Sequence, residues 1–312
     1  MINLKDKKIL VTGGAGFLGS FVVERLLARG VPKNHITVPL SKNDDLRKAE
    51  VCRRVVKGHE IVIHVAASVG GLRFVKDHPA EAFYDSAAMA INMIDESYRA
   101  GVEKFVGIGS VCEYPKFVPL PFKEENLWDG YPEPDNAAYG LAKKMMLVQS
   151  QAYREQYGFN AIHLLMVNLY GPRDNFDLMR SHVIPALIRK VYEAKKNKTG
   201  FIEIWGTGIA SREFLYADDA AEGILLATEK YNKSEPVNIG RNDELLIKDL
   251  IQIMCRLMDY NPEIRWDATR PDGQPKRRFD VSRAEKEFGF KAQTGFEEGL
   301  KKTIDWYINI QK

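Results

Sequence analysis

The sequence feature that most constrains the fold is a glycine-rich turn between an apolar run and an amphipathic segment. Residues 8–12 have the composition of a buried strand, and residues 17–29 have helical spacing. In the turn, Gly13, Gly16 and Gly19 are spaced as GxxGxxG, a one-residue variant of a dinucleotide-binding fingerprint. There the first glycine permits a tight turn, the second admits a pyrophosphate, and the third lets strand and helix pack closely.

This strand–turn–helix context favours a dinucleotide site over a glycine-rich turn that binds nothing. The pyrophosphate would meet the helix N-terminus, where backbone N–H groups have no partner within the helix. The predicted cofactor contacts in this turn are Gly13, Gly14, Ala15, Gly16, Phe17, Leu18 and Gly19.

Short apolar runs alternate with longer amphipathic segments through the first half of the chain, which is typical of βαβ units. We therefore predict an α/β fold, a Rossmann-type doubly wound parallel sheet with a smaller C-terminal α/β substrate lobe. Residues 1–170 would form the dinucleotide-binding domain and residues 171–312 the smaller lobe, parts of which return to the first domain. Further strands are expected at 36–38, 60–65, 104–108 and 160–167, and helices at 79–100, 137–157, 181–196, 218–230 and 247–259.

Composition excludes several classes of protein. The 45 Lys and Arg residues against 42 Asp and Glu give a net charge of only +3, too even to favour nucleic acid as a partner. Cys52, Cys112 and Cys255 lie far apart and form no metal-binding pattern, so we predict no metal. No stretch approaches the roughly 20 apolar residues of a membrane span. We predict a cytoplasmic protein that does not associate with membranes.

The region after the second strand bears on the choice of cofactor. An NAD site usually places an acidic residue there, on the ribose hydroxyls. Here residues 38–43 contain no acid, and Asp44 and Asp45 come later, where they could instead start a helix. Ser41 and Lys42 are suited to receive a 2′-phosphate, although a solvated lysine is common in loops. We therefore predict NADP(H) as the cofactor.

A hydroxyl, a phenol and an ammonium make up the candidate catalytic set. Tyr139 and Lys143 are four residues apart at the start of a helix, so they share one face. A nearby ammonium is expected to lower the phenol pKa. Ser110 follows the fourth strand, at the edge where open parallel sheets bind ligands, and precedes a long proline-rich stretch.

Ser110, Tyr139 and Lys143 together resemble the catalytic set of the extended short-chain dehydrogenase/reductases. Within that branch, the segment 110–116 (SVCEYPK) is similar to a signature of the GDP-L-fucose synthase family. So are 69–71 (VGG), 168–176 (NLYGPRDNF), 181–187 (SHVIPAL), 205–208 (WGTG), 212–214 (REF) and 271–275 (PDGQP). The resemblance implies epimerisation at C3 and C5 of GDP-4-keto-6-deoxy-D-mannose and reduction at C4 with NADPH. It also implies cofactor contacts at Ala66, Lys143, Val167, Asn168, Leu169 and His182.

The resemblance also assigns a base and an acid. Protons at C3 and C5 lie α to the C4 ketone, so their removal gives an enolate and needs both a base and an acid. Cys112 and His182 match the family positions used for this work. The alternatives are that Cys112 is a buried filler and that His182 is a solvent-facing helix start.

The resemblance further implies a nucleotide-sugar site. Two departures from the family pattern are Glu113, where an apolar residue is more usual, and Val111, where serine is frequent. They leave open a different GDP-keto sugar, such as a heptose or a dideoxy sugar. The substrate-binding positions carried over are Lys190, Trp205, Arg212, Asp272 and Arg277.

Three other activities compete with this interpretation. A nucleotide-sugar 4-epimerase of the same fold would keep NAD tightly bound, but Cys112, His182 and the missing acid argue against it. A 4,6-dehydratase would need an Asp-Glu pair where this chain has Val111 and Cys112. A sensor of NADP without catalytic activity would not need Ser110, Tyr139 and Lys143.

The resemblance also implies a homodimer in which the helices at 79–100 and 137–157 pair across a two-fold axis. Small or apolar residues on these helices favour the pairing over a fully solvated face. The alternative is that they face only their own sheet. The residues are Ala87, Ala88, Ala90, Ala142, Met145, Met146 and Tyr153.

Overall fold

A six-stranded parallel sheet forms the centre of the larger part of the molecule. The computed structural model describes residues 1–270 and 274–312. The strand order is β10-β5-β4-β3-β1-β2, and each pair of neighbouring strands in the sheet is parallel. The predicted doubly wound α/β fold is therefore confirmed. The strands are β1 (Ile9–Thr12), β2 (Ile36–Thr37), β3 (Ile61–His64), β4 (Lys104–Ser110), β5 (Ala161–Met166) and β10 (Val237–Ile239).

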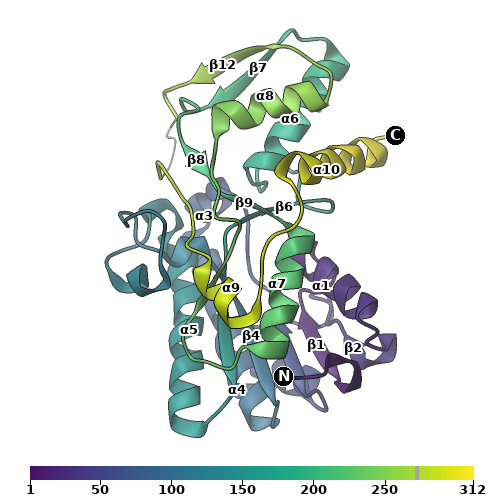
Figure 1. Ribbon diagram of the computed structural model, residues 1–312, viewed down its shortest axis with the longest axis vertical. Helices are drawn as coiled ribbons and strands as arrows, with labels where there is room; N and C mark the ends of the chain where they lie inside the picture. The colour runs from purple at the N-terminus through teal and green to yellow at the C-terminus, as the bar shows by residue number, and fades with distance from the viewer. Residues whose placement is uncertain (271–273) are drawn as a thin grey trace.

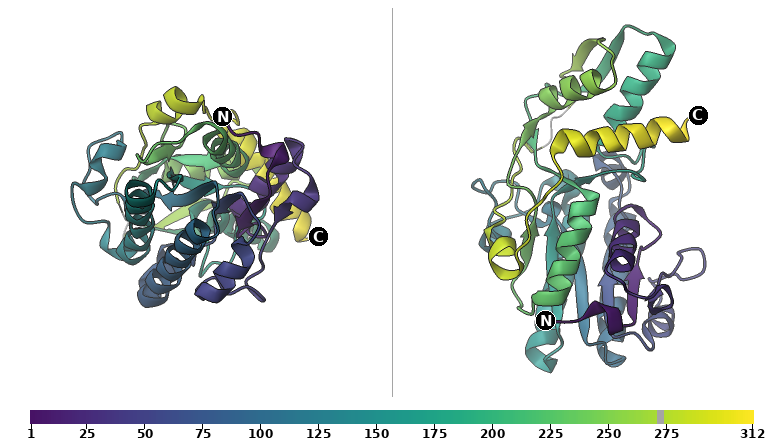
Figure 2. Two further views of the ribbon diagram at one scale, coloured as in Figure 1. Left: turned by 90° about the horizontal axis from the view of Figure 1, so that it is seen from below. Right: turned by 45° about the vertical axis from the view of Figure 1, so that its right-hand side comes forward.

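Helices cover both faces of the sheet (Figures 1 and 2). In β1, Ile9 and Val11 pack on the α1 and α7 side, whereas Leu10 packs on the α4 side. Strands buried on both faces are therefore apolar throughout instead of alternating with polar residues. One face carries α1 (Phe17–Ala28), α7 (Ala217–Lys230) and α9 (Ser282–Phe288), and the other α2 (Ala49–Val56), α4 (Pro79–Arg99) and α5 (Ala137–Tyr157).

The strand order reverses at β1, which lies between β2 and β3. The connection from β1 runs one way, to β2, and the connection from β3 runs the other way, to β4, which opens a crevice between the carboxyl ends of β1 and β3. The glycine-rich turn follows β1, and the candidate catalytic residues follow β4. The fold therefore brings both parts of the predicted site to one edge.

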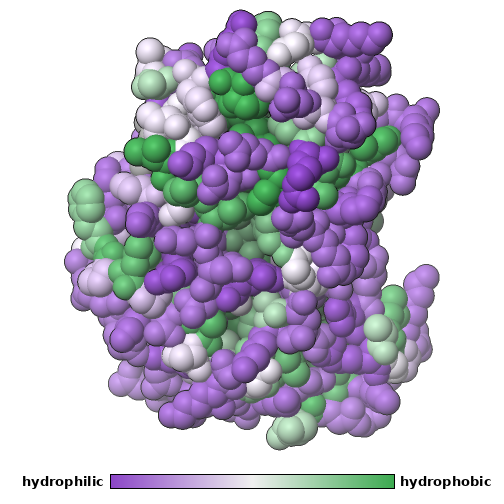
Figure 3. Space-filling model, turned by 45° about the horizontal axis from the view of Figure 1, so that its top comes forward, coloured by the Kyte–Doolittle hydropathy of each residue, from purple (hydrophilic) through white to green (hydrophobic). Residues whose placement is uncertain are grey.

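A smaller lobe stands at this edge, at the top of Figure 1. It has its own apolar core, which includes Ile188, Ile204 and Leu250. Figure 3 shows hydrophobic residues along the recess where this lobe meets the sheet domain. The lobe contains α6 (Val183–Asn197), β7 (Phe201–Trp205), α8 (Ile247–Leu257), β12 (Glu263–Asp267) and α10 (Phe296–Ile310), and short pairs join β6 (Asn168–Tyr170) to β9 (Phe214–Tyr216) and β8 (Ser211–Arg212) to β11 (Leu245–Leu246).

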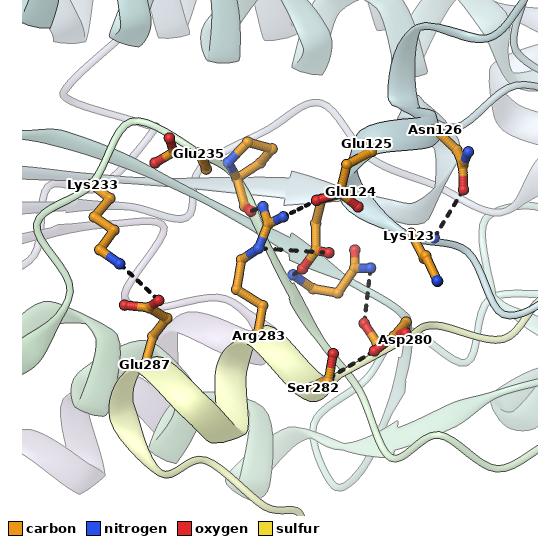
Figure 4. A network of polar contacts seen from close by, with 12 residues as sticks. Lys123, Glu124, Glu125, Asn126, Lys233, Glu235, Asp280, Ser282, Arg283 and Glu287 are labelled. Atoms are coloured by element: carbon orange, nitrogen blue, oxygen red, sulfur yellow. Dashed lines mark hydrogen bonds and ion pairs between the residues drawn. The ribbon is translucent and has the colours of Figure 1, made fainter.

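The chain returns from the second half to the sheet through β10, and a buried asparagine there ties distant segments together. The Asn238 side chain donates to the carbonyls of Phe122 and Asp280 at 2.9 and 3.1 Å and accepts from the Tyr114 hydroxyl at 2.8 Å. Nearby, Arg283 of α9 pairs with Glu124 and Glu125 (Figure 4). These contacts hold the proline-rich stretch 111–136, which contains short 3-10 turns, against the sheet.

Several local elements differ from the sequence-based expectation. The strands β10 and β12 and the short helix α3 (Leu72–Asp77) were not expected from the sequence, and the helix considered at Asp44 and Asp45 begins only at Ala49, as α2. The helix expected at 181–196 begins at Val183, because the preceding residues form a turn. No helix within the described residues is both long and apolar enough to cross a membrane.

Candidate active site

At Gly13 and Gly19 the glycine-rich turn is packed so tightly that no side chain fits. Gly13 has φ of +70°, a left-handed conformation that favours glycine. A Cβ on Gly13 would lie 2.9 Å from the backbone nitrogen of Ala66. A Cβ on Gly19 would lie 2.0 Å from the carbonyl oxygen of Gly13. The third glycine therefore allows the close helix–strand packing that the spacing predicts.

The N-terminus of α1 fits a pyrophosphate. Gly16 is the N-cap of α1. It has no side chain that could accept a hydrogen bond from the first N–H groups of the helix. The first turn contains no acidic residue that would repel a phosphate. Free N–H groups and the positive end of the helix dipole attract an anion here. Ala15 and Gly16 are exposed on this turn, whereas Leu18 and Gly19 are buried beneath it.

A buried hydrogen bond joins the strand ends on which the turn rests. Thr12 Oγ1 lies 2.8 Å from His64 Nδ1 and accepts from the Ala66 N–H at 3.3 Å. Burial lowers the pKa of His64 to about 3, so the imidazole is neutral at physiological pH. The contact fixes Ala66, a predicted cofactor position, directly against Gly13.

The segment after β2 presents a cation and a hydroxyl but no free carboxylate. Ser41 and Lys42 are exposed. Asp44 accepts from Arg54 at 2.6 Å, and Asp45 accepts from Arg47 at 2.8 Å. Both acids are therefore engaged by arginines. Both also precede α2, which begins only at Ala49. This donor set fits a 2′-phosphate better than a bare ribose.

The structure brings Ser110, Tyr139 and Lys143 to adjoining ends of β4 and α5. Lys143 Nζ donates to the Ile108 carbonyl at 2.8 Å and lies 6.0 Å from the centre of the Tyr139 ring. The Ser110 Oγ accepts from the Cys112 N–H at 3.2 Å, which leaves its proton available for donation to a ligand. Lys143 is thus bonded to β4 two residues before Ser110, and Tyr139 lies one helical turn before Lys143.

The electrostatics of this set differ from the expectation. Burial, the Cys112 thiol and the Glu113 carboxylate raise the pKa of Tyr139. Burial lowers the pKa of Lys143 to about 8, partly offset by Glu113. The prediction of a lowered phenol pKa is therefore wrong for this structure, because desolvation outweighs an ammonium that bonds elsewhere. A phenol that keeps its proton is suited to act as an acid.

Cys112 lies beside Tyr139. Its side chain is half-buried and packs against the cluster formed by Val75, Ala82 and Tyr139. A Cβ on Gly140 would lie 2.1 Å from the Cys112 carbonyl oxygen, so α5 rests directly on the turn that carries the thiol. By contrast, Cys52 and Cys255 are buried in helices, and burial raises the pKa of both thiols.

His182 is the N-cap of α6 and is exposed to solvent. Surrounding protein nevertheless lowers the pKa of its imidazole by desolvation. The loop before it is fixed to the segment after β3, because the Gly71 N–H donates to the Arg180 carbonyl at 2.7 Å. A Cβ on Gly71 would lie 2.2 Å from the Ser181 carbonyl oxygen, so glycine is required for this approach.

The predicted substrate positions fall into two groups. Lys190 Nζ lies 5.9 Å from the centre of the Trp205 ring, and both line a groove beside α6. Arg212 and Arg277 lie on adjacent segments, since the Glu213 N–H donates to the Arg277 carbonyl at 3.0 Å. Arg277 is buried and Trp205 is half exposed. Asp272 lies outside the described residues.

The remaining predicted cofactor positions lie just after β5, beside the segments that carry the predicted substrate residues. Val167 follows β5 and is buried, and Leu169 is half-buried in β6. Asn168 donates to the Glu213 carbonyl at 2.9 Å and so joins the cofactor edge to the substrate segments. Sequence reasoning missed Arg270, whose guanidinium lies 5.1 Å from the Trp205 ring centre. No short motif marks Arg270, and only the fold brings it to Trp205.

The fold and site define a nucleotide-dependent enzyme of the extended reductase type, and comparisons agree. Residues 9–240 match the NAD dependent epimerase/dehydratase family, and the chain belongs to that family.

Curated relatives then narrow the resemblance. The "GDP-L-fucose synthase" of Sinorhizobium fredii is 38% identical over 99% of this chain and 98% of its own length. "GDP-L-fucose synthase 1" of Arabidopsis thaliana is 36% identical over 97% of this chain and 94% of its own length. The resemblance predicted from the motifs is thereby confirmed.

Solved structures of similar fold carry related names. A GDP-6-OMe-4-keto-L-xylo-heptose reductase from C. jejuni has a TM-score of 0.91 and 27% identity, covering 100% of this chain and 99% of that chain. A GDP-L-fucose synthetase from Naegleria fowleri bound to NADP has a TM-score of 0.86 and 29% identity, covering 100% of this chain and 97% of that chain.

Proposed function

We propose that this chain epimerises GDP-4-keto-6-deoxy-D-mannose at C3 and C5 and reduces C4 with NADPH, giving GDP-L-fucose. The observation that carries the proposal is the thiol of Cys112 packed beside Tyr139, next to Ser110 and Lys143. A plain ketoreductase needs the hydroxyl, phenol and ammonium but no thiol. The names of the curated relatives support the same reaction.

NADPH supplies the hydride for the reduction. The α1 N-terminus binds its pyrophosphate, and Ser41 and Lys42 bind the 2′-phosphate. Lys143 binds the nicotinamide ribose. The further cofactor contacts come from Ala66, Val167, Asn168, Leu169 and His182.

In the epimerisation, the Cys112 thiolate removes the proton α to the C4 carbonyl, first at one carbon and then at the other. Ser110 donates a hydrogen bond to the enolate oxygen, where the negative charge develops. His182 returns a proton to the opposite face of each carbon. Proximity of the thiolate also favours the protonated form of Tyr139, so the acid needed for the second stage is preserved.

In the reduction, Tyr139 donates its proton to the C4 oxygen while Ser110 holds that oxygen in place. The phenol becomes a phenolate, and the ammonium of Lys143 stabilises its charge. The GDP portion is bound by Lys190, Trp205, Arg212, Asp272 and Arg277, of which the arginines are suited to the diphosphate.

The deciding experiment follows the product by NMR after incubation with GDP-4-keto-6-deoxy-D-mannose and NADPH in D₂O. The wild-type product should be the L-sugar, with deuterium at both C3 and C5. Cys112→Ser replaces a thiol by a hydroxyl, which is much harder to ionise. This variant should lose the exchange and slowly reduce the unepimerised ketone, whereas His182→Asn should slow reprotonation. Deuterium exchange by Cys112→Ser at the wild-type rate would sink the assignment of the base.

A second candidate is 4-reduction of a related GDP-keto sugar, such as a keto-heptose. The similarity to the C. jejuni heptose reductase, at a TM-score of 0.91, favours it. Such an enzyme needs no proton exchange at C3 and C5. NADPH consumption with a GDP-keto-heptose but not with the 6-deoxymannose substrate would select this activity.

A homodimer formed through α4 and α5 is part of the proposal. Of the residues expected on that face, Ala87, Ala90, Ala142 and Met146 are instead buried within the protomer, so they face their own sheet. Met145, one of the expected residues, is exposed, and together with other exposed apolar side chains it supports the pairing, because a solvated surface rarely needs so many of them. The exposed apolar residues of the two helices are Phe83, Tyr84, Ile91, Met145, Val148 and Tyr157.

Light scattering at micromolar concentration should give a mass of twice 35.4 kDa. We also propose a cytoplasmic location, supported by the three free cysteines, and a division between the NADP-binding and nucleotide-sugar lobes at residue 170.

A further inference from the structure

A buried acid–base pair lies directly beneath the candidate catalytic residues. Glu113 ends the 3-10 turn Val111–Glu113, and His163 lies in the middle of β5. Both side chains are fully buried. His163 Nε2 lies 3.0 and 3.1 Å from the two carboxylate oxygens of Glu113. An ionised carboxylate only accepts hydrogen bonds, so Nε2 carries the proton and donates it to Glu113.

The same carboxylate fixes the backbone of the catalytic turn. Glu113 Oε1 accepts from the Ser110 N–H at 2.8 Å, while Ser110 Oγ accepts from the Cys112 N–H. This reciprocal arrangement is a capping box around a turn of only three residues. The orientations of the Ser110 hydroxyl and of the Cys112 peptide therefore both depend on Glu113.

The pair takes the space that a side chain at position 109 would need. A Cβ on Gly109 would lie 2.3 Å from His163 Nε2 and 2.4 Å from Glu113 Oε1. Gly109 lies between Ile108, whose carbonyl accepts from Lys143, and Ser110. The pair thus packs against the stretch of β4 that holds both Lys143 and Ser110.

The pair also places a negative charge near a buried ammonium. Burial disfavours the charged form of Lys143, and the Glu113 carboxylate acts in the opposite direction by raising the Lys143 pKa. Among the described residues, Glu113 is the ionisable group whose charge has this effect. Without it, an isolated ammonium would remain in a site where Lys143 is only 3% exposed.

The other titratable groups around Lys143 do not provide that charge. On α5, Tyr139 is held protonated, and Lys144 bonds the Leu127 carbonyl and stacks on Trp128 instead. On β3, His64 is neutral. The remaining group is the Cys112 thiol beside Tyr139, on the same turn as Glu113.

We propose that Glu113 and His163 act as a positioning pair: Glu113 orients Ser110 and Cys112 and keeps Lys143 protonated, and His163 holds the carboxylate in place. This inference rests on the proposed function for the roles of Ser110, Cys112 and Lys143. The pair itself joins residues 50 positions apart, and both side chains are fully buried.

Glu113→Gln separates charge from shape. The amide oxygen still accepts from the Ser110 N–H, so the turn is kept while the negative charge is lost. We expect the Lys143 pKa to fall below its value of about 8. The basic limb of the kcat profile should then move to lower pH, because a smaller fraction of Lys143 is charged. A shift of one pH unit lowers kcat about tenfold on that limb, with KM little changed.

Glu113→Asp tests the orienting role of Glu113 while its charge is kept. The shorter carboxylate keeps the charge but withdraws from the Ser110 N–H. The Lys143 pKa should therefore stay near that of the wild type while kcat falls. His163→Gln retains an N–H donor toward the carboxylate and should behave nearly as the wild type, whereas His163→Leu removes the donor that holds the carboxylate and should lower kcat as Glu113→Asp does.

Glu124→Gln is the matched control. Glu124 is also buried in the 111–136 stretch and accepts a backbone N–H, that of Asn238, at 2.9 Å. Its substitution should affect stability without moving the pH profile. A merely structural role for Glu113 predicts that Glu113→Gln and Glu124→Gln behave alike.

The readout that does not depend on turnover is an NMR titration of Lys143 in protein carrying isotope-labelled lysine, assigned with Lys143→Arg. An unchanged Lys143 pKa in Glu113→Gln overturns the charge role, and wild-type kcat in Glu113→Asp overturns the orienting role. If the wild type fails to turn over the proposed substrate, the proposed function is wrong. The titration would still decide the charge role of the pair.

Discussion

The contact between Gly140 and Cys112 offers a sharp test of how the site is assembled. Gly140 is the second residue of the YGLAK segment, between Tyr139 and Lys143, and is buried against the turn that carries the thiol. A methyl group at this position would lie 2.1 Å from the Cys112 carbonyl oxygen and 2.8 Å from its carbon. The clash is with backbone, so a rotamer change in a flexible side chain cannot relieve it.

The size of the effect follows from that distance. Ordinary contacts between such atoms are about 3.5 Å or longer, so α5 and the turn must separate by about 1 Å. Misplacement of about 1 Å costs on the order of 100-fold in rate when reacting groups must align. Overpacking destabilises by roughly 1–3 kcal/mol, and the better helix propensity of alanine returns about 1 kcal/mol. Gly140→Ala should thus remain folded but lose about 100-fold in kcat.

The assay is NADPH consumption with GDP-4-keto-6-deoxy-D-mannose, run beside deuterium exchange at C3 and C5. Both rates should fall, because the shift moves Tyr139 and Lys143 away from Ser110 and Cys112. Gly295→Ala is the control, since a Cβ there meets its nearest neighbour at an ordinary 3.9 Å. Wild-type kcat and thermal stability for Gly140→Ala would refute the view that α5 rests on the catalytic turn.

Three further predictions concern the cofactor and the acid. Gly19→Ala should abolish NADPH binding in a fluorescence titration, because its Cβ would lie 2.0 Å from the Gly13 carbonyl oxygen; retained affinity contradicts the close packing. The wild type should bind NADPH more tightly than NADH, and Lys42→Ala should narrow that difference in Kd; equal wild-type affinities would count against a 2′-phosphate site. Tyr139→Phe should lower kcat about 100-fold or more with an unchanged Kd for NADPH, and near-normal turnover would identify a different acid.

Local spacing was enough to predict the parts of the site that lie close together in the chain. The close approach of Gly19 to Gly13 joins residues six positions apart, so GxxGxxG indicates both the turn and this packing, whereas the approach of Gly13 to Ala66 depends on the neighbouring strand β3. Likewise, Tyr139 and Lys143 share a helix face because of helical periodicity alone. Buried parallel strands have continuous apolar runs, which is why β1, β3, β4 and β5 were recognised.

Weaker local patterns did not predict the structure correctly where contacts between distant segments determine it. Ser282 with Glu285 has the spacing of a capping box, yet α9 has Val281 as its N-cap and the Ser282 N–H is taken by Asp280. The strand β10 has only three residues, too short for a pattern, and is a strand because β5 offers a free edge.

The sequence by itself determined the fold class, the nucleotide turn and the identity of the candidate catalytic residues, because each depends on the order of neighbouring side chains. Tertiary structure alone decided their electrostatics. Burial lowers the Lys143 pKa and raises the Tyr139 pKa. The shift of Tyr139 is opposite to the lowered phenol pKa that was expected from the YxxxK spacing. Desolvation and the field of Glu113, held by His163 from another strand, depend on how distant segments pack around the site, which no local motif encodes.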